Sequence, residues 1–203
     1  MSPTLLAAAR IAVITLIGTV VTQLVYIGIS SSGGEVNRDI IWGVEVVLFA
    51  VIAVAGFALI AARPIMGAAL GTFGLLNTIQ AGVGLVMFGP LFEGGEALAP
   101  FAGAVLAVAF LLYFAAKLAI GLGALIAGLL AFRYTTGASK ALGGLAALAG
   151  IVAAVLNAAA IFPATDLTYP AGGAGTLATL LLALILVPVT TAVTQFEAER
   201  AAR

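Results

Sequence analysis

The sequence contains no cysteine and no histidine, and few of its residues carry a charge. Of its 203 residues, 8% are charged and 64% are hydrophobic, whereas about a quarter of the residues of an ordinary soluble domain are charged. Without cysteine and histidine, the chain has no disulfide, no thiol or imidazole catalysis, and no zinc or haem site with the usual ligands. We therefore expect no enzyme activity, no cofactor and no metal site. The eight basic and eight acidic residues balance, so nucleic-acid binding is not expected either.

Long apolar runs dominate what is present. A helix needs about 20 mostly apolar residues to cross the hydrocarbon core of a bilayer. Six stretches meet this requirement: residues 6–29, 40–62, 65–88, 105–132, 141–162 and 174–194. The breaks between them are short and contain turn-forming or charged residues, as in SSSGGEVNRD at 30–39. The sequence thus predicts an all-α integral membrane protein, a bundle of six transmembrane helices that forms a single domain over residues 1–203.

The fourth span is too long for the membrane. The apolar stretch from Leu98 to Phe132 would make a helix of about 50 Å, against about 30 Å of hydrocarbon. Splitting it at Lys117 would give two half-length spans and reverse the orientation of everything that follows. We instead predict one helix whose first part, around Pro100 to Gly103, lies along the outer interface or folds back.

Basic residues predict the orientation of the bundle, because cytoplasmic loops are enriched in lysine and arginine. With six spans, most of the basic residues fall on one side of the membrane: Arg10, Arg63, Arg133, Lys140, Arg200 and Arg203. The loops on the other side carry the acids Glu35, Asp39, Glu93, Glu96 and Asp166, with Arg38 as their one base. We therefore predict cytoplasmic N- and C-termini in a multi-pass protein of the cell membrane, such as a bacterial inner membrane.

Small residues recur at four-residue spacing within the spans. The pairs are Gly67-xxx-Gly71, Ala124-xxx-Gly128, Gly143-xxx-Ala147 and Gly150-xxx-Ala154. Such ridges let helix backbones approach each other closely. They predict dense packing within one bundle. The alternative is that they form a face for another membrane protein or for a second copy of the chain.

Six strongly polar side chains interrupt the apolar spans at one depth. Counted along each helix from its basic end, they lie about 20–27 Å from the cytoplasmic surface, in the outer half of the bilayer. They are Gln23, Glu45, Asn77, Gln80, Lys117 and Asn157. An ionisable group at such depth costs on the order of 3 kcal/mol unless it pairs or meets water. Because Glu45 is the one acid within any predicted span, we predict that it pairs with Lys117.

This polar layer has two interpretations. It either joins the helices, as interhelical hydrogen bonds in membranes do, or binds a ligand. Because the polar groups lie in the outer half above an apolar inner half, the sequence predicts small-molecule or ion binding, or transport, by these six residues. The alternative is a non-catalytic accessory or assembly subunit of a larger membrane complex. No catalytic residue is predicted.

The expected architecture resembles that of a known group of membrane proteins. The stretch AARIA places Ala8 and Ala12 four residues apart on the first span. In plan, the chain is similar to the vitamin-capturing subunits of energy-coupling-factor importers. Those proteins also have six helices, both termini inside and a pocket on the outer side, and they dock through an alanine-xxx-alanine face. The similarity is one of architecture, and it implies docking through the Ala8 face.

Overall fold

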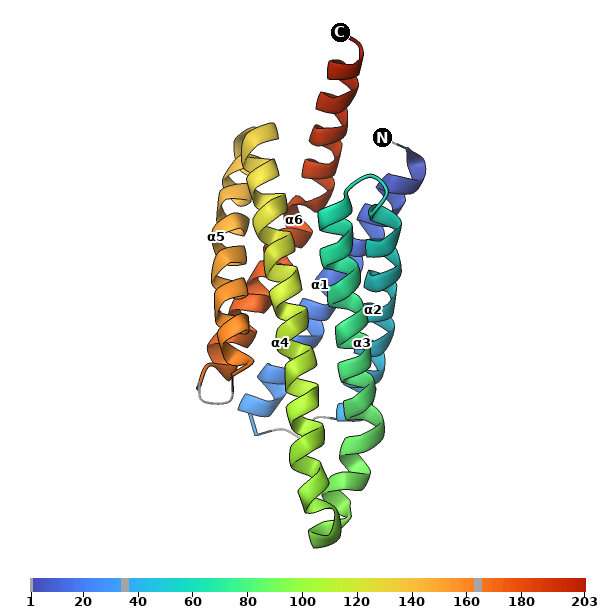
Figure 1. The fold of residues 1–203 in the computed structure, drawn as a ribbon, viewed down its shortest axis with the longest axis vertical. Helices are drawn as coiled ribbons and strands as arrows, with labels where there is room; N and C mark the ends of the chain where they lie inside the picture. Colours follow the sequence, from blue (N-terminus) through green and yellow to red (C-terminus); the bar gives the residue numbers. More distant parts are fainter. Residues whose placement is uncertain (1, 34–36, 163–165) are drawn as a thin grey trace.

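The computed structural model describes residues 2–33, 37–162 and 166–203, and these form an all-helical bundle (Figure 1). Six helices are long and apolar enough to cross a membrane. They are α1 (Pro3–Ser31), α2 (Arg38–Leu59), α3 (Pro64–Glu93), α4 (Gly95–Tyr134), α5 (Gly137–Ala160) and α6 (Thr168–Ala201). Each covers most or all of one predicted span, so the polytopic helical bundle is confirmed. Glu35, predicted in the first outer loop, lies outside the described residues.

Local signals in the sequence explain where several helices begin. The side chains of Ser2 and Asn37 accept hydrogen bonds from backbone N–H groups three residues further on, at 3.2 and 3.1 Å, and so cap α1 and α2. Pro3 and Pro64 occupy the first positions of α1 and α3, where a missing N–H breaks no intrahelical hydrogen bond. Gly95 has a φ of 62°, which lets the chain reverse direction between α3 and α4.

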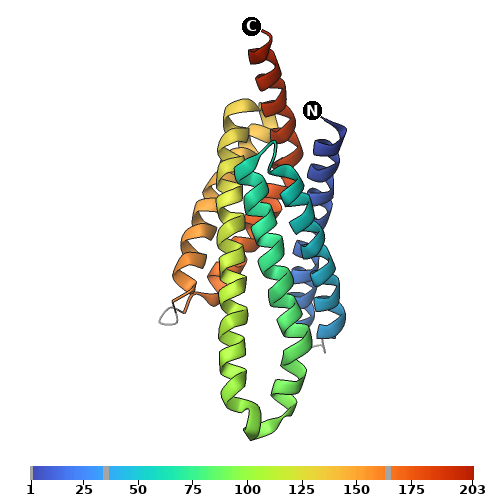
Figure 2. The same ribbon diagram turned by 45° about the vertical axis from the view of Figure 1, so that its right-hand side comes forward.

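The helices form a ring with one helix outside it. In the described part of the chain, α1 packs against α2, α2 against α3, α3 against α4, α4 against α6, and α6 back against α1, whereas α5 packs on α4 and α6. Both termini lie at the same end of the bundle (Figures 1 and 2). At that end, Arg63 of the α2–α3 turn forms a salt bridge with Glu197 of α6 at 3.1 Å. The assignment of this end to the cytoplasm stays a prediction.

Glycines bring two pairs of helices into backbone contact. A Cβ atom on Gly74 of α3 would lie 2.4 Å from the backbone nitrogen of Ala53 in α2. A Cβ atom on Gly128 of α4 would lie 2.4 Å from the backbone nitrogen of Ala147 in α5. Since no side chain fits at these distances, both interfaces require glycine. Gly128 belongs to a predicted ridge, and the other glycines of these ridges pack in the same two interfaces: Gly67, Gly71, Gly143 and Gly150. These ridges therefore act within one bundle.

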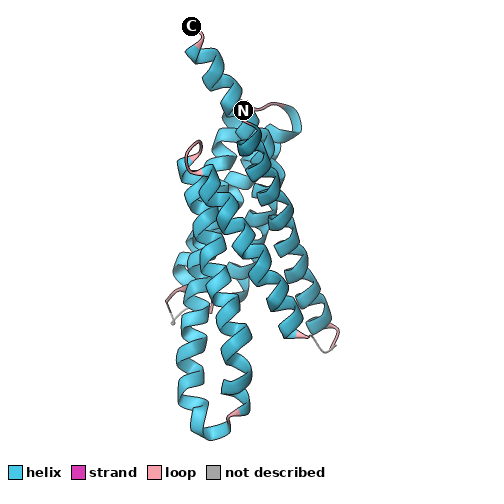
Figure 3. Cartoon of the chain, turned by 90° about the vertical axis from the view of Figure 1, so that its right-hand side faces the viewer, coloured by secondary structure: helices cyan, strands magenta, loops and turns pink. Residues whose placement is uncertain are grey.

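The course of α4 differs from the prediction. It is one continuous helix of 40 residues, about 60 Å long, and its first part does not fold back. It continues beside α3, and the α3–α4 hairpin projects beyond the other helices (Figures 2 and 3). The prediction was wrong because α3 is long enough to accompany α4. Val83 and Met87 of α3 lie across an apolar groove of about 200 Å³ from Ala104, Val105 and Val108 of α4.

The close approach of α2 and α3 predicts that Gly74→Ala destabilises the protein. The added methyl group would meet the backbone of α2 at 2.4 Å, so the two helices must move apart, at a cost of about 1–3 kcal/mol. Gly82→Ala in the same helix is the matched control, because nothing lies within 4 Å of a Cβ atom there. Thermal unfolding of the purified protein in detergent measures both variants. Equal melting temperatures for the two would contradict the contact.

Candidate functional site

Lys117 is buried in the bundle, and in the described part of the chain no carboxylate contacts it. Its side chain is 0% exposed. Nζ donates to Gln23 Oε1 of α1 at 3.3 Å and to Thr176 Oγ1 of α6 at 3.4 Å, longer than the roughly 2.7–2.9 Å of an ammonium–carboxylate bond. The ring centroids of Phe73 and Tyr113 lie 5.8 and 5.5 Å from Nζ, within cation–π range. Neutral oxygens and aromatic faces therefore surround the charge.

A glycine of α6 makes room for the Lys117 stem. A Cβ atom on Gly175 would lie 2.5 Å from Cδ of Lys117 and 3.0 Å from its Cβ and Cγ. The aliphatic stem therefore runs close along the backbone of α6, next to Thr176. This contact directs the ammonium group into the bundle, where it meets Gln23 of α1, instead of letting it extend to the membrane surface as exposed lysines do.

Glu45 lies near Lys117, but the predicted ion pair does not form. Both residues are described, and no oxygen of Glu45 comes within 4.0 Å of Nζ. Glu45 Oε1 instead accepts a hydrogen bond from Thr22 Oγ1 at 2.9 Å. Glu45 and Lys117 stay apart because α3 separates α2 from α4 in the ring. Both hydrogen bond to α1, where Glu45 contacts Thr22 and Lys117 contacts the next residue, Gln23.

The other three predicted residues serve different contacts. Asn157 is fully buried, and its Nδ2 donates to backbone carbonyls of α5 and α6 at 2.8 and 2.9 Å, so it joins these two helices. Asn77 Nδ2 donates to a backbone carbonyl of its own helix at 3.0 Å. Gln80 is partly exposed. Among the described residues, these three are not hydrogen bonded to Gln23, Glu45 or Lys117.

Three residues of the site were not predicted: Thr22, Tyr113 and Thr176. We expect a threonine inside a helix to bond its own backbone, and Thr22 and Thr176 do so at 2.9 Å. Both also contact a side chain of another helix, and Thr176 Oγ1 lies 2.6 Å from Gln23 Oε1. Thr22 adjoins Gln23 in the sequence and Tyr113 precedes Lys117 by about one turn, so these two were within reach of sequence analysis. Thr176 had no such signal, because packing alone brings α6 to α1.

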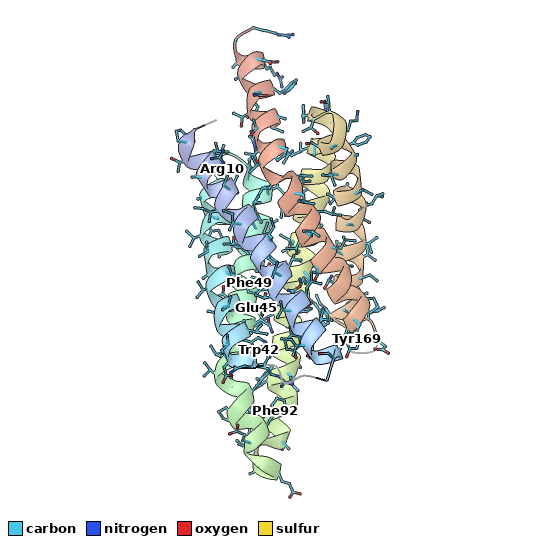
Figure 4. All side chains as sticks on the ribbon, turned by 180° about the vertical axis from the view of Figure 1, so that it is seen from behind. Arg10, Trp42, Glu45, Phe49, Phe92 and Tyr169 are labelled. Atoms are coloured by element: carbon cyan, nitrogen blue, oxygen red, sulfur yellow. The ribbon has the colours of Figure 1, made fainter. Side chains whose placement is uncertain are left out.

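The polar cluster (Thr22, Gln23, Glu45, Tyr113, Lys117 and Thr176) is bordered by buried residues on the side of the termini. Its members other than Lys117 are partly exposed. About one turn nearer the termini, each helix of the ring has a residue at most 1% exposed: Thr19, Phe49, Phe73, Ile120 and Thr179. Figure 4 shows this order along α2, where Phe49 lies nearer than Glu45 to the end that carries the termini. A closed floor thus lies beneath the cluster.

Comparison of the chain with models of known protein families, with curated proteins and with solved structures gives no match. The architectural similarity to vitamin-capturing importer subunits therefore gains no support. The alanines that carry it are not on a free face either, because Ala8 and Ala12 are 8% and 0% exposed. The function has to be argued from the polar cluster itself.

Because Lys117 has no carboxylate in contact, we expect Lys117→Met to leave the protein as stable as before or more stable. Methionine fills similar space, and replacing buried charges by apolar groups is often neutral or stabilises by about 1–4 kcal/mol. Removing one partner of a direct buried ion pair would instead cost about 3–5 kcal/mol. Thermal unfolding in detergent distinguishes the two cases, with Glu45→Gln measured alongside. A large fall in the melting temperature of Lys117→Met would contradict the separated geometry.

Proposed function

We propose that this polytopic membrane protein binds a small solute or ion in the polar cluster as a step in its transport. The observation that carries the proposal is the fully buried ammonium group of Lys117, which has no carboxylate of the described residues within 4.0 Å. Each N–H of an ammonium group needs an acceptor, and the two acceptors of Lys117 are neutral and distant. Charges inside membrane proteins are costly and mark substrate or ion pathways. A ligand oxygen would complete the coordination.

The exposure of the surrounding residues supports access from one end. Glu45, Gln23 and Thr176 keep part of their surface exposed, whereas the floor beneath them is closed. A few polar groups converging in a largely apolar setting are typical of small-molecule sites. Our proposal is that a ligand enters from the end opposite the termini, which the sequence predicts to be the outer side.

The packing of the helices supports movement across the cluster. Glycines hold α2 against α3, and α4 against α5, by backbone contacts. The contacts across the cluster are made by side chains, such as Lys117 with Gln23 and Glu45 with Thr22. Two tight pairs that meet through side chains can shift relative to each other as rigid bodies. Such a shift would open the floor without breaking either glycine interface.

The experiment uses glycine, acetate, methylammonium, sodium and phosphate as probes. Their binding to the purified protein and their flux into proteoliposomes are measured. We expect at least one probe to bind, and Lys117→Met to weaken the binding of a probe with an anionic group about tenfold or more, equivalent to about 1.4 kcal/mol. Gly175→Ala should also weaken the binding of this probe, because the new Cβ atom displaces the Lys117 stem while every charge is kept. Gly173→Ala is the control, with nothing within 4 Å of its Cβ atom. No binding of any probe, or equal binding by all variants, would contradict the proposal.

A second candidate, an accessory subunit that binds another membrane protein, is favoured by the α3–α4 hairpin. At about 60 Å, α4 is about twice the thickness of the hydrocarbon core, so part of the hairpin lies outside it. Its surface is nevertheless apolar, with Val86, Phe92 and Phe101 between 56% and 70% exposed. Exposed apolar patches outside lipid mark protein interaction sites.

The charges of the hairpin indicate the kind of partner. Between residues 83 and 108 the charged residues are Glu93 and Glu96, both at the tip. Two copies side by side would bring these like charges together. We therefore propose that the occupant is an apolar segment of a different membrane protein, flanked by basic residues.

Crosslinking tests this second function. A photoreactive residue in place of Phe101 is expected to link one membrane protein through an apolar segment next to basic residues. The link should be lost when Glu93 and Glu96 are both changed to lysine. The same residue in place of Leu148 of α5, which is 64% exposed, is the control for contact with lipid. Links to lipid alone, or to a second copy of this chain, would contradict the second candidate.

A further inference from the structure

The polar cluster holds two opposite charges apart in the interior of one bundle. Lys117 is on α4 and Glu45 on α2, and the two helices are separated by α3. No oxygen of Glu45 lies within 4.0 Å of Lys117 Nζ. Each is anchored at its own position, Lys117 by Gln23, Thr176 and the contact with Gly175, and Glu45 by Thr22. The separation is therefore a feature of the packing.

A ligand with a single charge would fit only part of this arrangement. An anion at Lys117 would also lie near the carboxylate of Glu45, and a cation at Glu45 would lie near the ammonium group of Lys117. Like charges repel strongly where the effective dielectric constant is low. The attraction of a singly charged ion to one of the two residues is therefore largely offset by its repulsion from the other. A molecule that carries both charges, placed in the reverse order, gains at both ends.

We infer that the polar cluster binds a small zwitterion, a molecule in which an anionic group and an ammonium group are a few bonds apart. The inference rests on the proposed function and names the class of its ligand. The anionic group of the ligand accepts hydrogen bonds from Lys117 Nζ and its ammonium group donates to Glu45. The hydroxyl of Thr176 and the side chain of Gln23, 2.6 Å apart, supply further polar contacts beside Nζ.

Two further features favour such a ligand. The ring of Tyr113 lies 5.5 Å from Lys117 Nζ, so an aromatic face lines the cluster next to the ammonium group, where the ammonium group of a ligand could also contact it. The cluster contributes one positive and one negative group, and a zwitterion adds none to the total. The occupied site therefore contains no unmatched charge, which is the condition for burying ionic groups at low cost.

The test compares each zwitterion with its two single-charge halves on the purified full chain. The zwitterions are glycine, β-alanine and γ-aminobutyrate, which differ in the separation of their charges, and the halves are the matching carboxylates and alkylammonium ions. Equilibrium binding of labelled compounds gives the Kd values. We expect the best zwitterion to bind at least about tenfold more tightly than either of its halves, equivalent to about 1.4 kcal/mol.

Variants assign the two ends of the ligand. Lys117→Met should bind the zwitterion only as tightly as the unchanged protein binds the alkylammonium half. Glu45→Gln should bind it only as tightly as the unchanged protein binds the carboxylate half. Gly175→Ala, with Gly173→Ala as control, tests the position of Lys117 with both charges present, in case a charge variant does not fold. If a zwitterion binds equally well to the unchanged protein and to Lys117→Met, Glu45→Gln and Gly175→Ala, its assignment to this cluster is overturned.

The outcomes separate this inference from the proposed function. If a carboxylate, an alkylammonium ion, sodium or phosphate binds at the cluster as tightly as the best zwitterion, the zwitterion inference is wrong and the proposed function stands. If no probe of any kind binds, both are contradicted.

Discussion

Backbone contact at glycine is the constraint on which the rest of this bundle depends. In lipid, apolar side chains gain little by leaving their surroundings, so helices associate through close packing and hydrogen bonds. Cβ atoms on Gly56, Gly74, Gly128 and Gly150 would lie 2.3 to 2.4 Å from the backbone of a neighbouring helix. These contacts define two tight pairs, α2 with α3 and α4 with α5. The other helices join the pairs through side chains.

The polar cluster lies where the two pairs meet, and this links the packing to the proposed function. Glu45 belongs to one pair and Lys117 to the other, so the distance between the charges depends on how the pairs are placed. α1 contacts both charges through Thr22 and Gln23. A relative movement of the pairs would change the separation of the charges and the closure of the floor together. If the proposed ligand binds here, its occupancy and the arrangement of the helices would be coupled through the same few residues.

The α3–α4 hairpin connects the pairs and also projects beyond them (Figure 3). The helix that carries Lys117 is therefore the helix that carries the apolar groove near the hairpin tip. A partner bound at this groove would contact α4 directly. The same continuous helix runs from the groove to the polar cluster. The two proposed functions, transport and association with a partner, would therefore both involve α4.

Residue counting determined much of this protein. The length of the apolar runs decided that lipid is the solvent and that there are six spans, and an even number of spans places both termini at one end. Depth along a straight helix is also a matter of counting, which is why Gln23, Glu45 and Lys117 were predicted to lie in one layer. The tertiary structure decided which faces meet. It separated Glu45 from Lys117, turned Asn157 toward backbone carbonyls, brought Thr176 and Gly175 to the site, and kept α4 straight beside α3. The physical reason is that the rotation of a helix about its axis and the choice of its neighbours follow from contacts between residues far apart in the chain, which spacing within one helix does not encode.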